Sequence, residues 1–340
     1  MTDRPHALSR SSKDDERRPS CGLPGGFSLL ELIVAMAVLA IMAVMMLSVT
    51  SSAQRLAKQT TSRVEQFREA RRAFERINQT LSQATLNPYW DYVDTNGRPR
   101  TTNTSFTPAN YFRLSELRYL QTNASALAAP RGGTMAGGSA FFQAPLGKSD
   151  TVSGLNSLLN TVGFFIERGS DSSLRPPTVT AAAKTRYRLF ELLEPTENLT
   201  IYGLTSGNST YSGTNWFTTP LANATNSHRL ADNIVALVFQ AQYTTANSLP
   251  TNSFNYTSAP QGVGLTQAVE ENNLPPNVRV TMIAVDEISA RRIADQNIAL
   301  TDATNDTLLA TLEQQLSDNR LNFRRFESTV SIGPAKWSSK

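Results

Sequence analysis

GFSLLELIVAMAVLAIMAVMMLSV, residues 26–49, is an apolar run that opens directly after a glycine and carries one charge, Glu31, near its start. About 20 apolar residues in a helix cross a bilayer, so residues 27–49 are predicted to form a membrane-spanning helix. A carboxylate inside such a helix costs roughly 2.5–3.5 kcal/mol on insertion scales. A plain anchor has no use for this acid, whereas a subunit that aligns with similar neighbours in a membrane does.

The bulk composition is that of an ordinary folded chain. Its 340 residues are enough for one large domain or two modest ones, and 40% hydrophobic with 18% charged residues excludes wholesale disorder. The net charge of +4 is small for this length and does not indicate a nucleic-acid partner. Cys21, the only cysteine, precedes the apolar run. If residues 1–26 are removed, the mature chain has no disulfide, no thiolate nucleophile and no cysteine metal site.

The segment before the apolar run, residues 1–26, is a long hydrophilic leader. A cleaved secretory signal has a core of about 7–15 residues followed by a small-residue site, whereas here the core is longer and residues 50–53 make a poor site. Basic residues lie on both sides of the run, so the positive-inside rule does not set the orientation. The remainder, rich in Asn, Thr and Ser, is most easily placed outside the cytoplasm. An uncleaved signal anchor with an incidental Glu31 remains the alternative.

Gly26-Phe27-Ser28-Leu29-Leu30-Glu31 resembles the processing signal of type IV pilins and type II secretion pseudopilins. The resemblance implies that a prepilin peptidase cleaves between Gly26 and Phe27 and that Phe27 becomes the N-methylated first residue. It also implies that Glu31, at the fifth mature position, guides assembly by meeting the Phe27 amine of a neighbouring subunit. The implied partners are the membrane, the prepilin peptidase, other pilin-like subunits and an assembly platform. The implied location is the inner membrane, crossed once, with the C-terminal domain in the periplasm or in an extracytoplasmic fibre.

Simple chemistry agrees with these roles. Gly26 lets the backbone lie extended in a protease groove without a side chain in the way. Cleavage leaves a positive α-amine on Phe27, with a reference pKa of about 7.7–8.0. Opposite charges attract far more strongly in a low-dielectric layer than in water, and an unpaired Glu31 there is costly. The pair would set the stagger of the subunits, while the apolar helices supply the packing.

The helix is predicted to continue beyond the membrane. No proline or glycine interrupts residues 27–86, and Pro88 then ends the run. That makes a helix of about 60 residues, or roughly 90 Å at 1.5 Å per residue. Its second half, residues 50–86, is expected to pack against a sheet through an amphipathic stripe of Val64, Phe67, Ala70, Phe74, Ile77, Leu81 and Ala84. The opposite, charged face is interpreted as solvated.

Residues 87–340 are predicted to form a globular α+β body, with an antiparallel sheet packed on the long N-terminal helix as in pilins. Apolar alternation predicts strands, and helical periodicity predicts helices. The predicted strands are 186–193, 199–204, 234–243, 277–285 and 323–332, and the predicted helices are 287–296 and 306–319. Two glycine pairs, at 132–133 and 137–138, fit neither a phosphate loop nor a dinucleotide fingerprint and are interpreted as a flexible loop.

Most of the chain is also similar to the Verru_Chthon cassette protein C family, whose members are pilin-like proteins of a gene cassette. The similarity lies in residues 84–92 (ATLNPYWDY), 141–147 (FFQAPLG), 155–160 (LNSLLN) and 335–338 (AKWS). Residues 229–286 look like the late strands of large minor pseudopilins. Membership implies co-occurrence with other pilin-like proteins and no known activity. The apolar and aromatic patches quoted above are predicted to be core and loop-anchoring elements.

No catalytic, cofactor or metal site is predicted. With His228 alone and no cysteine in the mature chain, neither a Ser-His-Asp triad nor a multi-histidine metal site can be assembled. Asp91, Asp94, Asn96 and Gly97 match part of a calcium loop. The closing glutamate of such a loop is absent, and the stretch is first of all a turn.

The predicted function is that of a minor pilin or pseudopilin subunit of a type II secretion or type IV pilus-like system, and not of an enzyme. The large body favours a tip or accessory position in a short fibre. Two alternatives stay open. The first is a fibre-tip protein that binds a surface, DNA or an exported substrate, although nucleic acid is not the expected partner. The second is a signal-anchored periplasmic enzyme.

Overall fold

The computed structural model describes residues 28–95, 105–176, 178, 180, 182–201, 213–244, 250–260 and 267–335. The chain divides into two compact units, Met1–Lys58 and Gln59–Lys340, and each is described by itself. The class is α+β, with an apolar helix near the N-terminus and antiparallel sheets, which confirms the predicted class.

Helix α1 spans Leu29–Leu81, so it ends before the predicted Leu86. Its last turn tightens, because the N–H of Ala84 donates to the carbonyl only three residues back at 3.1 Å. The N–H of Thr85 then donates to the carbonyl of Gln143 at 2.9 Å. Pairing with a strand therefore replaces the next helical hydrogen bond, and the helix ends earlier than the position of the next proline suggests.

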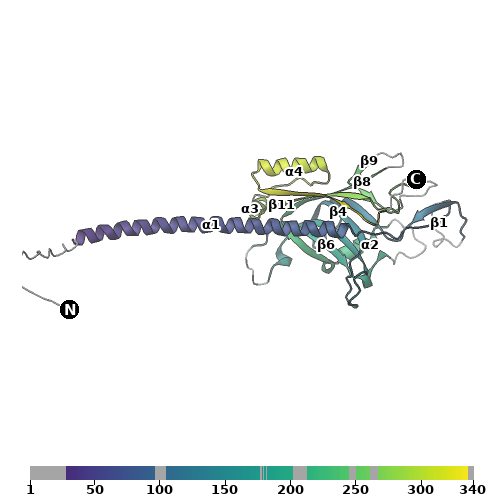
Figure 1. The fold of residues 1–340 in the computed structure, drawn as a ribbon, viewed down its shortest axis with the longest axis horizontal. Coiled ribbons are helices and arrows are strands. Elements are labelled where there is room, and N and C mark those ends of the chain that lie inside the picture. Colours follow the sequence, from purple (N-terminus) through teal and green to yellow (C-terminus); the bar gives the residue numbers. More distant parts are fainter. Residues whose placement is uncertain are drawn as a thin grey trace, which may run out of the picture. The chain divides into compact units, whose positions relative to one another are not determined.

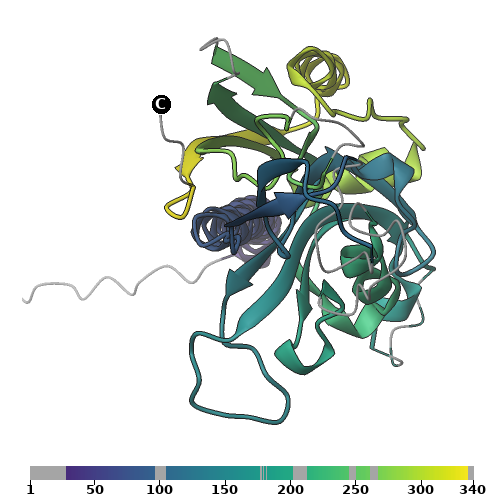
Figure 2. The same cartoon turned by 90° about the vertical axis from the view of Figure 1, so that its right-hand side faces the viewer.

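The strands that the structure describes form antiparallel sheets (Figures 1 and 2). A six-stranded sheet has the order β10-β3-β4-β5-β6-β7, a four-stranded sheet has the order β12-β11-β8-β9, and β1 pairs with β2 alone. The strands are β1 Tyr89–Val93, β2 Asn110–Leu114, β3 Tyr119–Asn123, β4 Thr134–Pro145, β5 Leu159–Ser170, β6 Thr185–Glu194, β7 Ser227–Asp232, β8 Ile234–Thr244, β9 Pro250–Ser253, β10 Tyr256–Thr257, β11 Asn277–Val285 and β12 Phe323–Ser331. The helices after α1 are α2 Asn215–Ala222, α3 Glu287–Asp295 and α4 Asp306–Asp318.

These elements stack in layers around the second half of α1. One face of the six-stranded sheet and one face of the four-stranded sheet both pack on α1. The outer face of the six-stranded sheet is covered by α2, whose Phe217 stacks on Phe141 and whose Trp216 belongs to the same buried cluster as Phe190. The outer face of the four-stranded sheet is covered by α3 and α4. The central strands β4, β5, β6, β8 and β11 are therefore buried on two sides, which explains their long apolar runs.

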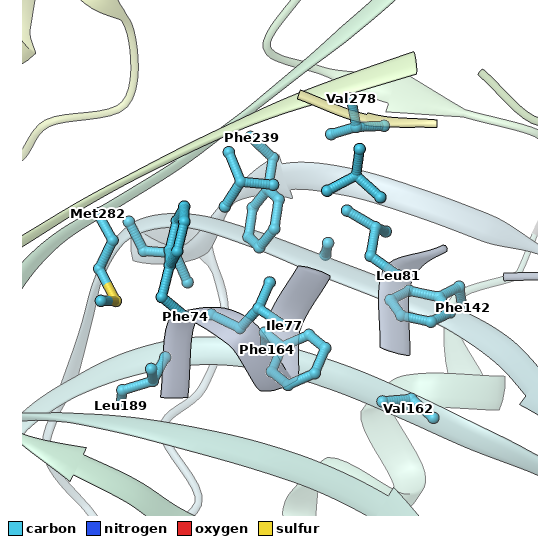
Figure 3. Packing of buried hydrophobic residues seen from close by; sticks show 14 of the residues in the cluster. Phe74, Ile77, Leu81, Phe142, Val162, Phe164, Leu189, Phe239, Val278 and Met282 are labelled. Atoms are coloured by element: carbon cyan, nitrogen blue, oxygen red, sulfur yellow. The ribbon is translucent and has the colours of Figure 1, made fainter. Parts of the chain in front are cut away.

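The second half of α1 lies at the centre of the main hydrophobic cluster. Figure 3 shows its Phe74, Ile77 and Leu81 between side chains of both sheets: Phe142, Phe164 and Leu189 from β4, β5 and β6, and Phe239, Val278 and Met282 from β8 and β11. Ile77 and Leu81 have no exposed surface. Fully burying one such side chain stabilises the fold by about 1.5–3 kcal/mol. This part of α1 is thus a structural member of the body and not a linker to it.

Most of the predicted elements are confirmed. The predicted strands 186–193, 234–243, 277–285 and 323–332 correspond to β6, β8, β11 and β12, and the two predicted helices correspond to α3 and α4. The predicted stripe is buried from Ala70 to Leu81 on α1 and at Ala84 just beyond its end, whereas Val64 lies outside the described side chains. The predicted strand 199–204 is wrong at its start, because Leu199 ends a 3-10 turn. Residues 202–204 lie outside the described part of the chain.

The predicted loop over the two glycine pairs is wrong for the second pair, whereas Gly132 and Gly133 lie in a turn just before β4. Gly137 and Gly138 lie inside β4, at a bulge between Ala136 and Ala140. Gly137 has φ +69°, and a Cβ added to it would lie 2.8 Å from the carbonyl oxygen of Leu237 in β8. Glycine is required here because the backbone of one sheet approaches the backbone of the other.

Helix α3 is held to β6 by a charged contact. Asp286 caps its N-terminus. The next residue, Glu287, accepts hydrogen bonds from both terminal nitrogens of Arg186 at 2.7 Å and from Asn233 Nδ2 at 3.1 Å. Burial alone would raise the pKa of Glu287, but hydrogen bonds from Arg186, Arg291 and Asn233 outweigh it and lower the pKa to about 2.

Replacing Glu287 with glutamine should remove a pH-dependent contribution to stability. Since the folded pKa is about 2 and the reference pKa is 4.5, the contribution is present above about pH 5 and is lost as the pH falls toward 2. We expect the variant to have about 2–3 kcal/mol less unfolding free energy at about pH 7 and to approach the wild type near about pH 2. Urea unfolding of the detergent-solubilised chain across this range measures the difference.

Glu75→Gln is the matched control for this measurement. Glu75 pairs with Arg71 at 2.8 Å on an exposed part of α1, and pairs of this kind contribute only about 0.3–0.5 kcal/mol. The control should therefore unfold like the wild type at every pH. A loss in Glu287→Gln that stays constant from neutral to acidic pH would contradict the role of its charge.

Candidate functional site

The first part of α1, Leu29–Gln54, is a candidate membrane segment. Its mean hydropathy is 2.8, and none of its most apolar window is buried inside the protein. Large apolar side chains along it are exposed, from Leu29 to Val49. Soluble proteins rarely expose an apolar surface of this extent. The segment is therefore compatible with a single-pass membrane anchor or with a signal sequence near the N-terminus.

Hydroxyl side chains at the end of this segment are satisfied by the helix itself. Thr50 Oγ1 donates to the carbonyl of Met46 at 2.8 Å, and the hydroxyls of Ser51 and Ser52 both donate to the carbonyl of Ser48 at 2.9 Å. Such back-bonding removes the need for water at these groups and slightly weakens or bends a helix. The polar residues 48–52 can therefore continue α1 out of an apolar layer without a break.

Glu31 lies in the first turn of α1 and is exposed. Its N–H donates to Ser28 Oγ at 3.2 Å, and the N–H of Leu32 donates to the Ser28 carbonyl at 3.2 Å, so Ser28 is the N-cap. The spacing Ser-x-x-Glu is that of a capping box, and a negative charge in a first turn also interacts favourably with the helix dipole. This gives a second physical reason for an acid at position 31, one that the sequence analysis missed although the spacing signals it.

The remaining predicted residues are placed as follows. Gly26 and Phe27, the predicted cleavage and methylation residues, lie outside the described residues, as do Asn96 and Gly97 of the partial calcium pattern. Asp91 lies in β1, where its Oδ1 accepts from the N–H of Tyr92 at 2.8 Å. Within the described ranges, no group of three His, Cys, Asp or Glu residues is placed to hold a metal ion. His228 is exposed on β7.

An ion pair ties α1 to the six-stranded sheet. Arg76 Nε lies 2.9 Å from Glu191 Oε1, and the Glu191 side chain is buried. Burial raises the pKa of Glu191, and the nearby Arg76 opposes that rise. Removing Arg76 would leave a buried acid without this cation, so the pair helps to define how the second half of α1 lies on the sheet.

The outer face of the β1–β2 ribbon is aromatic and exposed. Tyr92 lies opposite Tyr111 and Trp90 lies opposite Arg113, so these four side chains share one face. Trp90 is 56% exposed, Tyr92 47% and Tyr111 55%. The ring centroids of Trp90 and Tyr111 are 5.6 Å apart with planes 22° from parallel, and those of Tyr92 and Tyr111 are 5.2 Å apart. The patches that include residues 84–92 are predicted to be core and loop-anchoring elements, and the core part of this prediction is wrong for Trp90 and Tyr92.

Side-chain amides hold this ribbon in place at the end where β1 begins and β2 ends. Asn87 Oδ1 accepts from the N–H groups of Glu116 and Leu117 at 3.0 Å each, which fixes the chain entering β1 to the chain leaving β2. The amide of Gln267 pairs with the backbone of Arg113: Nε2 donates to its carbonyl at 2.6 Å, and Oε1 accepts from its N–H at 3.2 Å. Gln267 thus occupies the position of a neighbouring strand beside β2 at this end of the ribbon.

Comparison of the chain with protein-family models, with curated proteins and with solved structures gave no match. The α+β class, the apolar N-terminal helix and the antiparallel sheets are read from the structure itself. The similarity of residues 26–31 to a prepilin processing signal stays a prediction, and so does every role that it assigns to Gly26, Phe27 and Glu31.

Proposed function

We propose that this protein is a minor pilin or pseudopilin subunit that is cleaved between Gly26 and Phe27 and then assembles with other pilin-like subunits into a short fibre. The observation that carries the proposal is that the two parts of α1 have different surroundings. Its first part is apolar, exposed and long enough to cross a bilayer, and its second part is the centre of the body's core. A simple anchor needs only the first of these properties.

The position of Glu31 supports the same proposal. Its carboxylate lies in the first turn of an exposed apolar helix, where a charge without a partner is unfavourable once the helix enters lipid. A neighbouring subunit that has lost its leader offers a positive α-amine on Phe27. Pairing the two groups satisfies both charges and fixes the stagger between adjacent helices. The subunit would be held in the inner membrane before assembly, with its body on the periplasmic side.

The mature N-terminus tests this proposal most directly. The full chain is expressed in cells that contain a prepilin peptidase and process another pilin precursor, and the purified protein is examined by mass spectrometry. We expect a chain that begins with N-methylated Phe27. Cells without the peptidase should yield the chain with its leader. If the leader is retained while the other precursor is processed in the same cells, the chain is not a substrate and the proposal fails.

A binding role at a fibre tip is the second candidate function. One specific observation favours it, namely the three exposed aromatic side chains, Trp90, Tyr92 and Tyr111, on one face of the two-stranded β1–β2 ribbon. Aromatic residues are enriched where proteins recognise partners, because they bring a large contact area at low conformational cost. The two functions are compatible, since a tip subunit can use α1 for assembly and the ribbon for contact.

A further inference from the structure

We propose that the side chain of Glu194, at the end of β6, is a pH-sensitive latch that holds α2 on the six-stranded sheet while it is protonated and loosens α2 when the proton leaves for bulk water. The inference concerns the body alone and does not depend on cleavage at Gly26. It rests on the burial of the Glu194 carboxyl group, on the lack of a cation facing it, and on a connection from this group to α2.

Glu194 differs from the other buried acids of the six-stranded sheet. Among the described residues of this sheet, Glu167, Glu191 and Glu194 are buried, each at most 5% exposed. Basic side chains act on Glu167, and Arg76 pairs with Glu191. No cation of the described structure acts on Glu194, and its Oε2 atom has no hydrogen-bond partner there. A carboxylate at this position has nothing to offset its loss of water.

The elements next to Glu194 supply no counter-charge. On β5, Glu194 lies opposite Thr161, and the charged residue of β5 closest to Thr161 in sequence is Glu167. In the turn after β6, Glu197 is exposed and accepts hydrogen bonds from residues 149–151. Residues 198–227 contain no acid, base or histidine, so α2 and the chain on both sides of it are uncharged.

The basic groups of the surrounding chain are engaged elsewhere. His228 of β7 lies opposite Glu191 and acts on that acid. Lys148 Nζ is 2.6 Å from Asp150. Arg131 donates to two backbone carbonyls at and just before the start of β7, at 2.8 and 2.6 Å. The latch carboxyl group therefore loses its charge by binding a proton and not by pairing with a cation.

Burial raises the pKa of Glu194 from 4.5 to about 7, while the side chain of Thr161 and the backbone N–H of Thr200 oppose the rise. The buried carboxyl group is thus neutral in acid and charged in alkali. A raised pKa in the closed state means that the closed state is fully favoured below the pKa of the hydrated group. This advantage is lost as the pH rises through about 7.

Thr200 connects the latch to α2. Its N–H acts on the Glu194 carboxyl group, and its hydroxyl donates to the carbonyl of Trp216 in α2 at 3.0 Å. Leu199 and Ile201, on either side of Thr200, pack in the same apolar cluster as Trp216. A charged Glu194 gains water only if this short segment moves away from the sheet. Helix α2 then loses its attachment to the segment.

The surface under α2 is aromatic. Phe141, Phe165 and Phe190 belong to the cluster that includes α2, and each is at most 2% exposed. Phe217 of α2 stacks on Phe141 with a centroid distance of 4.5 Å. Loosening α2 therefore brings apolar rings into contact with solvent, and it also opens the backbone hydrogen bonds of α2 to exchange.

The test is hydrogen exchange of the detergent-solubilised full chain at about pH 5.5 and about pH 8.5, read by mass spectrometry. Protection factors, corrected for the intrinsic pH dependence of exchange, report the opening equilibrium of α2. With a pKa of about 7 when closed and 4.5 when hydrated, we expect the opening constant to rise by at least about tenfold between the two conditions. Helix α4, which packs on the four-stranded sheet, is the internal reference and should keep its protection.

Three variants separate the latch from other effects. Glu194→Gln keeps the shape and cannot ionise, so the protection of α2 should not change with pH. It retains His228, so any pH dependence due to that side chain would persist. Glu197→Gln removes the exposed neighbouring acid and should show the full wild-type change. Thr200→Val removes the hydrogen bond to Trp216 and should increase opening of α2 by a similar factor in both conditions.

Three results would overturn the proposal. In the first, α2 of the wild type has equal protection in both conditions. In the second, Glu194→Gln retains the wild-type change. In the third, α4 loses protection as much as α2 does, which would report unfolding of the whole body and not release of α2.

Discussion

Replacing Gly137 with alanine is expected to destabilise the body by about 2–5 kcal/mol. Two costs add. An alanine at φ +69° is held in the left-handed region, which disfavours residues with a Cβ. Its Cβ would also lie 2.8 Å from the carbonyl oxygen of Leu237 and 3.3 Å from its nitrogen, so the backbone of β8 would have to move away from β4. Urea unfolding of the full chain in detergent measures the loss.

Gly132→Ala is the control that separates these two costs. Gly132 has φ +76°, close to that of Gly137, but a Cβ added there meets nothing within 4 Å. This variant should lose only the backbone part, about 1–2 kcal/mol. The difference between the two variants then reports how closely the two sheets approach at β4 and β8. Equal losses in both would show that the crossing tolerates a methyl group and that the close approach does not constrain the fold.

Replacing Glu31 with glutamine is expected to leave processing at Gly26 intact and to reduce incorporation into a fibre by at least about tenfold. Removing one partner of a buried ion pair costs about 3–5 kcal/mol. A tenfold reduction in incorporation corresponds to only about 1.4 kcal/mol. Glutamine retains the capacity to complete a capping box with Ser28, so it removes the charge and spares the helix start. The measurement is the ratio of mature subunit in sheared fibres to mature subunit in membranes.

Ser28→Ala and Glu31→Ala complete this series. Ser28→Ala removes the hydroxyl that accepts from the N–H of Glu31 and should cost about 0.5–2 kcal/mol of helix stability with little effect on incorporation. Glu31→Ala removes charge and cap together and should assemble no better than Glu31→Gln. If the glutamine variant assembles like the wild type while Ser28→Ala does not, the acid serves to start the helix, and its proposed role in docking is wrong.

The elements that sequence could predict are those with one strong local signal. Strand β11 matches its predicted bounds because Val278, Val280 and Met282 alternate toward the core. Helices α3 and α4 begin where predicted because Asp286 and Asn305 cap them with their side chains. In each case the local preference and the tertiary contact favour the same structure.

The parts that sequence could not predict depend on contacts between distant segments. The sequence of β4 predicts a loop because it contains Gly137 and Gly138. In the structure these glycines allow β4 to approach the backbone of β8, a contact that the sequence does not reveal. The end of α1 is set by the pairing of Thr85 with Gln143. Trp90 and Tyr92 read as core residues because aromatic side chains are mostly buried, and nothing local says which face of an isolated ribbon is left bare. Gly26 and Phe27 lie outside the described residues, so their predicted roles stay predictions.

The burial of α1 between two sheets has a mechanical consequence. Phe74, Ile77 and Leu81 contact strands on opposite sides of the helix, and the Arg76–Glu191 pair lies on the same stretch. A pull along the helix axis loads all of these contacts at the same time. They would therefore have to break together and not one after another. Resistance to such a load is then governed by the rate of unfolding of the whole body. A body built in this way would be expected to resist a pull on α1 without first losing its outer strands.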